Sequence, residues 1–388
     1  MMPFIDLKAQ FNILEPEVLR RIDTVLAHGK FIMGPEVQEL ESRLAAFVGT
    51  AHCVSCSSGT DALLLPLMAW SVGPGDAVFT TPFTFIATAE VISLLGATPV
   101  FVDIDPQTFN IDPVCLAKAI EAVKTGDQSL HPLPSAAKGL KPKGIITVDL
   151  FGQPADADPI MALAEEHGLF VLEDAAQGFG GVYKGRQAGA LGHCGATSFF
   201  PAKPLGCFGD GGAVFTDDDL LAGLMRSVRV HGQGTNKYDN VRVGLNGRLD
   251  TLQAAVLLAK LDAFPGELVA RNKAAARYEA GLADLVETPM VPETMVSSWA
   301  QYSVLHDERD RIMSGLKERD IPTMVYYPKP LHEQKAYAPL GYKPEDFPVS
   351  HRCAKRIFSL PMHPYLTEED TSKVAVAVRE VLDSARLV

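Results

Sequence analysis

One lysine, Lys203, stands in an apolar run directly before a glycine-rich segment, within residues 198–212 (SFFPAKPLGCFGDGG). Glycine lets the backbone turn tightly and lie close to a ligand. Apolar surroundings disfavour the ammonium form of lysine, and forming an imine is one way to relieve that charge. A surface lysine in a polar turn fits this run equally well, so the rest of the chain has to decide.

A second candidate site is an anion site at Ser57-Ser-Gly-Thr-Asp61. These residues follow a short apolar run, His52 to Cys56, and precede an apolar helix expected over Ala62 to Trp70. A strand that leads into a Gly/Ser/Thr turn at a helix start suits a phosphate, because free N–H groups and the helix dipole point at it. A plain helix cap by Ser58 or Thr60 is the competing interpretation.

A third candidate is the acid Asp174, which with Gln177 directly follows the strand expected over Leu169 to Leu172. The neighbouring sequence alternates between strands and helices. Strands are expected over 77–80, 99–103, 145–150 and 214–216, and helices over 86–95, from Asp112-Pro113, over 159–167 and over 218–228. This alternation predicts a mostly parallel sheet with helices on both faces, whose ligands lie at the carboxyl ends of the strands.

The remaining segments complete an α/β chain of two domains. Helices are expected over 15–28, 35–48, 249–261, 268–282, 309–319 and 368–384, further strands over 301–305 and 323–326, and a surface loop from Gly126 to Lys143. Pro265-Gly266 marks the expected domain boundary. We therefore expect a large domain over 1–264 and a small α/β domain over 265–388.

Composition narrows the class of protein. A net charge of −12 over 388 residues argues against nucleic-acid or anionic-membrane partners. No basic-then-apolar leader opens the chain and no long apolar run follows, so a cytoplasmic protein is expected. The six scattered cysteines indicate reduced thiols, and Cys53-Val-Ser-Cys56 lacks the partners of a zinc site. No metal is expected.

The three candidates together match the needs of pyridoxal 5'-phosphate (PLP). The lysine would hold the aldehyde as an imine, the acid would keep the pyridine nitrogen protonated, and the helix start would hold the phosphate. Phe85, after Thr80-Thr-Pro-Phe-Thr, is available to cover the ring, although a core phenylalanine is the competing interpretation.

With these residues in view, the chain resembles the DegT/DnrJ/EryC1/StrS sugar aminotransferases, which have the type I fold of aspartate aminotransferase. The matching blocks run through nearly the whole chain: Phe31-Ile-Met-Gly-Pro-Glu-Val, Ser58-Gly-Thr-Asp-Ala, Glu173-Asp-Ala-Ala-Gln177, residues 198–212, Asn246-Gly-Arg-Leu-Asp250 and Ser359-Leu-Pro-Met-His363.

The resemblance implies a role for each of these residues. Lys203 would form the imine, Asp174 would pair with the pyridinium nitrogen, and Gln177 would lie by the ring hydroxyl. The expected phosphate ligands are Gly59, Thr60 and Ser198, joined by Asn246 from a neighbouring subunit. An obligate homodimer with shared active sites follows. Lysine at 203, where sugar-dehydrating members have histidine, favours amino transfer.

The resemblance also implies the substrates: glutamate as amino donor and a nucleotide sugar with a keto group as acceptor. Members that aminate C3 of UDP-2-acetamido-2-deoxy-3-oxo-glucuronate for surface-polysaccharide synthesis match best, through residues 203–207, 242–255, Ala300-Gln-Tyr and 360–365. A 4-keto UDP-sugar, a dTDP-3-keto deoxysugar and a non-catalytic PLP-binding regulator stay open.

Substrate contacts are expected from Phe31, Lys237, Arg248 and Tyr327, with Arg229 and Arg242 as further cations for a diphosphate and a carboxylate. Some positions depart from the family pattern and put the sugar pocket in doubt. Asp149 stands where many relatives have histidine, Gly178-Phe179 replaces a small residue and histidine, and Tyr326-Tyr327 replaces a His-Tyr pair. The loop from Gly126 to Lys143 resembles an insertion.

Overall fold

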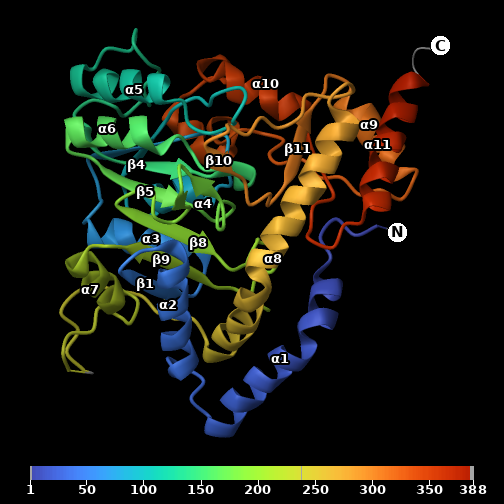
Figure 1. Cartoon of the computed structure of the whole chain (residues 1–388). Coiled ribbons are helices and arrows are strands. Elements are labelled where there is room, and N and C mark those ends of the chain that lie inside the picture. Colours follow the sequence, from blue (N-terminus) through green and yellow to red (C-terminus); the bar gives the residue numbers. More distant parts are fainter. Residues whose placement is uncertain (1, 237, 385–388) are drawn as a thin grey trace.

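A seven-stranded sheet forms the centre of the computed structural model, which describes residues 2–236 and 238–384 (Figure 1). In spatial order its strands are β1 (His52–Cys56), β9 (Gly212–Thr216), β8 (Cys194–Ser198), β5 (Phe170–Asp174), β4 (Lys141–Val148), β2 (Asp76–Thr80) and β3 (Thr98–Phe101). Strand β9 runs antiparallel to both neighbours, and every other pair is parallel. The predicted mostly parallel sheet is confirmed.

Helices cover both faces of this sheet. The helices of the first 282 residues are α1 (Leu7–His28), α2 (Pro35–Val48), α3 (Gly59–Ala69), α4 (Ala87–Leu94), α5 (Pro113–Thr125), α6 (Ala157–His167), α7 (Asp219–Val228) and α8 (Thr251–Leu282). Helices α3, α4 and α7 share one hydrophobic core, which fills one face. Helices α5 and α6, and separately α2 and α8, fill the other.

Local sequence signals explain where several helices begin. Asp112 caps α5 by accepting a hydrogen bond of 2.7 Å from the backbone N–H of Val114, and Pro113 occupies the first turn. Helix α1 begins at Leu7, eight residues earlier than expected, because the Asp6 carboxylate accepts from the N–H of Ala9 at 2.8 Å. The first residues of α1 alternate between apolar and polar (Leu7, Ala9, Phe11 and Ile13 are apolar), and a spacing of two does not indicate a helix.

The sequence pattern does not predict β8, the strand that leads to Lys203. Strand β8 contains small and polar residues, Cys-Gly-Ala-Thr-Ser, which have no strong β preference. It forms because β5 and β9 lie on either side of it. The strand expected over Thr323 to Tyr326 is wrong in extent, since only Met324 pairs, in a single bridge to Ser359.

The C-terminal residues form a second unit with its own core. Its elements are β11 (Tyr302–Leu305), α9 (Arg309–Lys317), α10 (Pro348–Arg356), β12 (Ile357–Leu360) and α11 (Glu368–Asp383). Side chains from the end of α8, from β11, α9, β12 and α11 make up this core. The N-terminal segment lies beside the unit, because the N–H of Met362 donates to the carbonyl of Phe4 at 3.2 Å (Figure 1).

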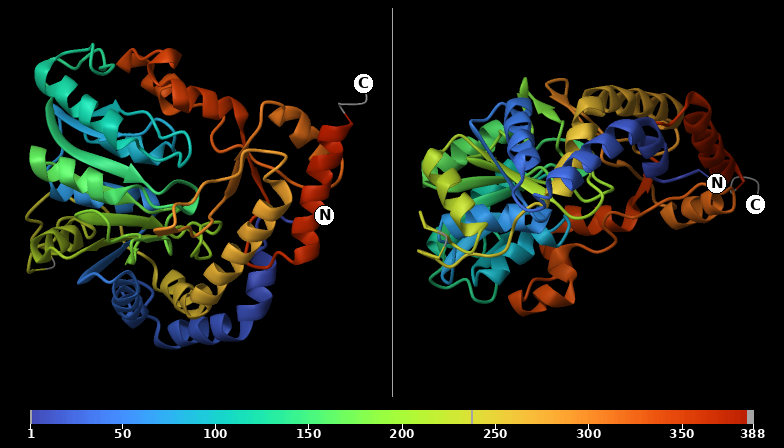
Figure 2. Two further views of the ribbon diagram at one scale, coloured as in Figure 1. Left: turned by 45° about the horizontal axis from the view of Figure 1, so that its top comes forward. Right: turned by 90° about the horizontal axis from the view of Figure 1, so that it is seen from below.

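The break expected between the helices over 249–261 and 268–282 is wrong, since α8 continues through Pro265 and Gly266. Proline removes one helical hydrogen bond, and packing of α8 against α1, α2 and α11 outweighs that loss. Figure 2 shows α8 linking the large sheet to the C-terminal unit. The division of the chain into domains 1–264 and 265–388 stays a prediction.

The remaining elements lie at the edges of these two units. They are a small sheet of β10 (Met295–Val296), β6 (Val182–Tyr183) and β7 (Arg186–Gln187), and the short 3-10 helices 150–152, 331–333, 335–340 and 344–346. The loop expected over 126–143 ends at residue 140, where β4 begins, and it is fastened by Ser135, whose N–H donates to the carbonyl of Leu340 at 2.8 Å. All six cysteines are free thiols. No helix in the described part of the chain is long and apolar enough to span a membrane.

Candidate active site

A cavity of about 450 Å³ lies where the carboxyl ends of β4, β5 and β8 meet the start of α3. Eight of the residues singled out from the sequence border it: Gly59, Thr60, Phe85, Asp174, Gln177, Ser198, Lys203 and Tyr327. They come from segments more than 250 residues apart in the chain, between Gly59 and Tyr327. The fold therefore brings the predicted chemistry to one place.

Asp174 is a buried acid at the end of the central strand β5, only 6% exposed. Its Oδ2 accepts a hydrogen bond of 2.7 Å from the Thr88 hydroxyl, which lies 3.0 Å from the hydroxyl of Thr84. Burial raises the pKa of Asp174, while the Thr88 hydrogen bond and the charge of Lys203 act in the opposite direction. The carboxylate therefore suits a cationic partner in the cavity.

Lys203 is half-buried and faces the same cavity. Its backbone N–H donates to the carbonyl of Phe200 at 2.8 Å, in the turn that follows β8. Burial lowers the pKa of Lys203, and the charge of Asp174 partly offsets that shift. A lowered pKa increases the fraction of neutral amine, which is the nucleophilic form. The interpretation as a solvated surface lysine is wrong.

The start of α3 is a ready anion site. Ser58 caps the helix, with its Oγ accepting from the N–H of Asp61 at 3.1 Å. Among the described residues, the N–H groups of Gly59 and Thr60 have no acceptor, so they are available to a ligand. A Cβ at Gly59 would lie 2.6 Å from the Cβ of Ser198, so only glycine lets these two segments approach.

Gln177 has its orientation fixed by two hydrogen bonds. Its Oε1 accepts from the N–H of Phe151 at 2.7 Å, and its Nε2 donates to the Tyr327 hydroxyl at 3.1 Å. The Tyr327 ring lies 6.4 Å from that of Phe85, measured between centroids. Phe85 is 54% exposed and borders the cavity, so it is not the core phenylalanine of the competing interpretation.

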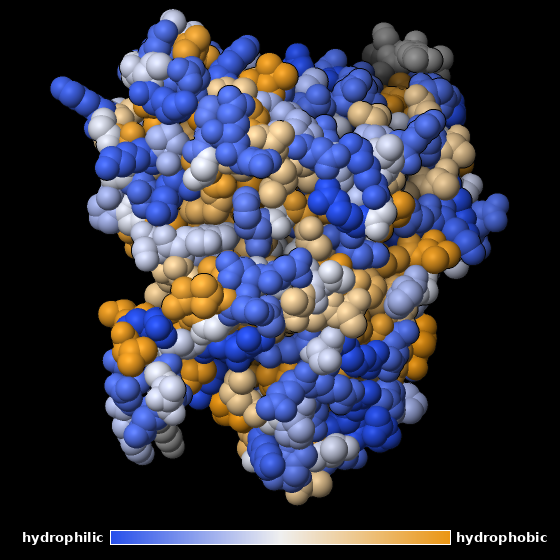
Figure 3. Space-filling view, turned by 60° about the vertical axis from the view of Figure 1, so that its left-hand side comes forward, coloured by the Kyte–Doolittle hydropathy of each residue, from blue (hydrophilic) through white to orange (hydrophobic). Residues whose placement is uncertain are grey.

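Three predicted contacts, Phe31, Asn246 and Arg248, do not line this cavity. Phe31 and Asn246 are exposed, and the Nε of Arg248 donates to the Oδ1 of Asn246 at 2.8 Å. Lys237 lies outside the described residues. Figure 3 shows the segments 231–236 and 238–244 projecting at the lower left, with apolar side chains near their base.

The expectation that Arg229 offers its charge to a substrate is wrong. Its guanidinium is 4% exposed and forms an ion pair of 2.5 Å with Glu41, because the loop after α7 folds back over β1. A second NH1 contact, of 2.7 Å, goes to the carbonyl of Ser55. Of the described residues, Lys203 is the only cationic side chain that borders the cavity.

Two of the departures from the family pattern, Asp149 and Gly178, lie against each other in the fold. A Cβ at Gly178 would lie 2.3 Å from the Cβ of Asp149, so a side chain at 178 would collide with Asp149. Asp149 does not border the main cavity. It shares a narrow internal space with Glu173, whose carboxylate accepts from the N–H groups of Gly189 and Leu191.

The structure adds residues that sequence reasoning missed. Thr84, Asp210 and Ile5 also border the cavity, and Thr88 contacts Asp174. Ser58, Gln301 and Tyr326 border it too, although the sequence named them only in the anion site, in a matching block and as a departure from the family pattern. Thr84 and Thr88 are four residues apart, a helical spacing that could have paired them. Ile5 has no sequence signal, because only the docking of the N-terminal segment brings it there.

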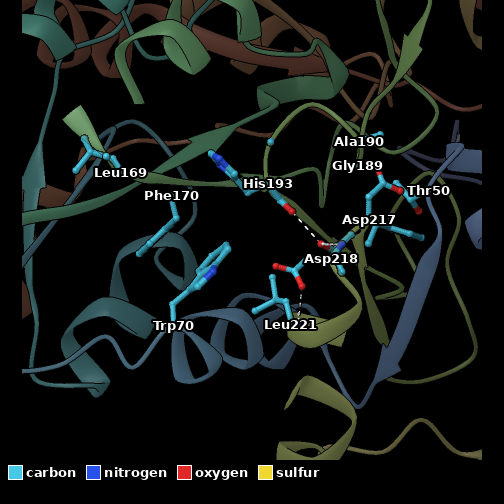
Figure 4. A pocket seen from close by; sticks show the side chains of 14 residues that line it. Thr50, Trp70, Leu169, Phe170, Gly189, Ala190, His193, Asp217, Asp218 and Leu221 are labelled. Carbon is cyan, nitrogen blue, oxygen red and sulfur yellow. Dashed lines mark hydrogen bonds between the residues drawn. The ribbon is translucent and has the colours of Figure 1, made fainter. Parts of the chain in front are cut away.

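A second hollow, of about 580 Å³, lies at the amino ends of β5 and β8 (Figure 4). The rings of Trp70 and Phe170 stack there at 4.2 Å between centroids. Asp218 caps α7, and the carbonyl of His193 accepts from the Thr216 hydroxyl at 3.0 Å. These polar groups already have partners within the fold, so this hollow has no feature of a reactive site.

The residues around the main cavity fit PLP. The free N–H groups at the start of α3 suit its phosphate, the buried carboxylate of Asp174 suits a protonated ring nitrogen, and the amine of Lys203 suits its aldehyde. Together with the seven-stranded sheet, they define a PLP-dependent enzyme of the aspartate aminotransferase-like type I fold.

Comparison with known proteins gives the family. Residues 12–379 match the model of the DegT/DnrJ/EryC1/StrS aminotransferase family, and the chain belongs to it. The chain is 47% identical, over 97% of its length and 98% of the relative's, to the UDP-2-acetamido-2-deoxy-3-oxo-D-glucuronate aminotransferase of Pseudomonas aeruginosa. It is therefore a PLP-dependent aminotransferase, as predicted.

Solved structures agree with this placement. A DegT/DnrJ/EryC1/StrS aminotransferase from Brucella abortus is 49% identical, with a TM-score of 0.93 over 98% of this chain and 99% of that one. The NtdA protein of Bacillus subtilis, solved with its bound cofactor PMP, is 29% identical, with a TM-score of 0.84 over 96% and 82% of the two chains.

Proposed function

We propose that this enzyme transfers an amino group from glutamate to C3 of UDP-2-acetamido-2-deoxy-3-oxo-glucuronate, in surface-polysaccharide synthesis. The meeting of Lys203, Asp174 and the start of α3 around one cavity supports the chemistry. The identity to the Pseudomonas aeruginosa enzyme over nearly both full chains supports the sugar. A 4-keto UDP-sugar or a dTDP-3-keto deoxysugar is the alternative acceptor.

Each residue around the cavity has a proposed task. PLP, when bound, supplies an electron sink for the carbon that loses its proton. The Nζ of Lys203 holds the cofactor's aldehyde and, once displaced, carries the proton between substrate carbon and cofactor. The carboxylate of Asp174, fixed by Thr88, keeps the ring nitrogen protonated.

Other residues hold the cofactor in place. Gln177 is oriented by Phe151 and Tyr327, and it would lie by the ring hydroxyl of the cofactor. The N–H groups of Gly59 and Thr60, with the Ser198 hydroxyl, bind the phosphate. Phe85, which is exposed and borders the cavity, would cover the ring.

We infer further that the active enzyme is a homodimer with shared sites. Phe31, Asn246 and Arg248 point to this arrangement because none of them borders the cavity of its own chain. Exposed large apolar side chains are also available for an interface: Phe31, Ile32, Phe200, Phe208, Val241 and Val243. In the dimer, Asn246 of one subunit would reach the phosphate in the other.

The reverse half-reaction tests the substrate. Holoenzyme is mixed with a UDP-3-amino-glucuronate or with a UDP-4-amino hexose, and the visible band of the lysine-bound cofactor is followed. Loss of the band with the 3-amino sugar alone supports the proposal. Loss with the 4-amino sugar alone overturns the substrate but keeps the aminotransferase, and a band that no amino compound changes favours a regulator.

Mixed dimers test the shared site. Lys203→Ala and Asn246→Ala subunits, each inactive or weakened alone, are unfolded together, refolded and assayed. Hybrid dimers would contain one intact site, so activity should rise above that of either variant alone. Activity that stays at the level of the separate variants, in a mixture shown to contain hybrids, contradicts a site shared through Asn246.

A further inference from the structure

Gln301 is the residue through which the C-terminal unit presents an amide to the cavity. It directly precedes β11 and is only 9% exposed. Its backbone N–H donates to the carbonyl of Phe151 at 3.3 Å, and the N–H of Phe151 donates to Gln177. The two glutamines are therefore linked through the backbone of one residue.

The neighbours of Gln301 hold it in place. Ala300 is 4% exposed, and Tyr302, which pairs with Leu360 in β12, is 1% exposed. Successive side chains of an extended segment point to opposite faces. The core position of Tyr302 therefore directs Gln301 toward the cavity.

The amide oxygen of Gln301 lacks a hydrogen-bond donor. Its Oε1 is buried and has no partner within residues 2–236 and 238–384, whereas both amide atoms of Gln177 are paired. Buried polar atoms are nearly always satisfied, and one that borders a binding cavity is available to a ligand. An acceptor without a donor calls for an O–H or N–H group.

We propose that Gln301 contacts the acceptor sugar and recognises one of its hydroxyl or amide N–H groups. This inference rests on the proposed function. The carboxylates of glutamate only accept hydrogen bonds, and its amino group has to face the aldehyde of the cofactor, so glutamate has no donor left for the oxygen of Gln301. A sugar with hydroxyls and an acetamido N–H can donate to this oxygen. Gln301 therefore contributes to the half-reaction with the sugar and not to the half-reaction with glutamate.

The test compares the two half-reactions in holoenzyme carrying Gln301→Leu. Its probes are the UDP-2-acetamido-3-amino-glucuronate and glutamate, each followed by the visible band of the cofactor. We expect kcat/KM for the amino sugar to fall by about tenfold or more, as for the loss of a buried hydrogen bond. We expect kcat/KM for glutamate to change by less than about twofold, because glutamate makes no hydrogen bond to Gln301 that the substitution could remove.

A matched control is Gln187→Leu on β7. The Oε1 of Gln187 is also buried without a partner, but the residue does not border the cavity. This variant should leave both half-reactions unchanged. Equilibrium binding of the amino sugar to Gln301→Leu, and its melting temperature, separate a lost contact from a misfolded site.

Three outcomes overturn the inference. If Gln301→Leu handles the amino sugar like the wild type, Gln301 does not contact it. If both half-reactions fall equally, the residue supports the fold or the cofactor. If the wild type itself does not react with the amino sugar, the proposed function and this inference fail together, a result distinct from the first two.

Discussion

The hydroxyl of Thr88 donates a hydrogen bond of 2.7 Å to the Oδ2 of Asp174, across 86 residues of sequence. Thr88 lies in the first turn of α4, and Asp174 ends β5. This bond favours the charged form of a carboxylate that burial would otherwise neutralise. Helix α4 therefore helps to keep the carboxylate of Asp174 charged at the proposed cofactor site.

Removing that hydroxyl should weaken cofactor binding. In Thr88→Val the buried carboxylate loses a hydrogen bond, and bonds to charged groups contribute about 1.5–3 kcal/mol. We expect the dissociation constant for PLP to rise by about tenfold or more. Titration of apoenzyme measures it, and Thr88→Ser should restore most of the affinity. An unchanged constant in Thr88→Val would remove Thr88 from this role.

Lys203→Ala should abolish turnover. The variant loses the amine that holds the aldehyde and moves the proton, and general acid–base groups alone contribute about 100-fold or more. The visible band should vanish while the elution volume stays that of the wild type. Lys260→Ala is the control, because burial also lowers the pKa of Lys260, to about 8, yet this residue lies against the Phe208 ring and outside the cavity. Amino exchange by Lys203→Ala would sink the assignment.

Gly59→Ala should loosen the phosphate site. A methyl group there would lie 2.6 Å from the Cβ of Ser198, so the start of α3 or the end of β8 must shift. PLP should dissociate more readily on dialysis. Gly266→Ala in α8 makes the same chemical change in open space and should stabilise the fold by about 0.5–1 kcal/mol. Equal cofactor retention by the two variants would show that the close contact is dispensable.

Asp149→Asn should alter stability at high pH. Burial and the nearby Glu173 raise the pKa of Asp149 well above its ordinary value. A raised pKa means stability that is full below the unfolded-state pKa and is lost as pH rises through the folded-state pKa. Urea unfolding should show wild-type stability declining toward alkaline pH, and less decline in the asparagine variant. Parallel pH profiles of the two proteins would contradict a protonated Asp149.

His363 should make the fold sensitive to acid. It is 3% exposed, and burial together with Arg271 lowers its pKa to about 4, against the influence of Asp6 and Asp370. A depressed pKa gives stability that is present above the ordinary value of 6.5 and is lost as pH falls toward about 4. The unfolding free energy should fall by up to about 3 kcal/mol over this range. His363→Leu should flatten that dependence, and a slope as steep as the wild type's would exclude His363 as its source.

Short-range patterns were enough to find the main chemical groups. Lys203 before its glycines, Asp174 after an apolar strand and the Gly/Thr start of α3 each combine a reactive residue with the local element that places it. Parallel strands bring their carboxyl ends to one edge, so these groups converge without knowledge of any particular contact.

Other features were decided only by packing. Pro265 does not end α8, because contacts with three other helices outweigh one lost hydrogen bond. Arg229 is buried in an ion pair with Glu41, and the charges along the sequence do not show which residues pair in the fold.

The sequence by itself determined the chemistry of this protein and the edge of the sheet where it occurs, because both depend on near neighbours in the chain. Only the tertiary structure decided what surrounds that chemistry: Thr88 beneath Asp174, and Gln301 and Ile5 at the wall of the cavity. These contacts join segments that are distant in sequence. Their positions depend on how whole units dock, and no local spacing encodes that geometry.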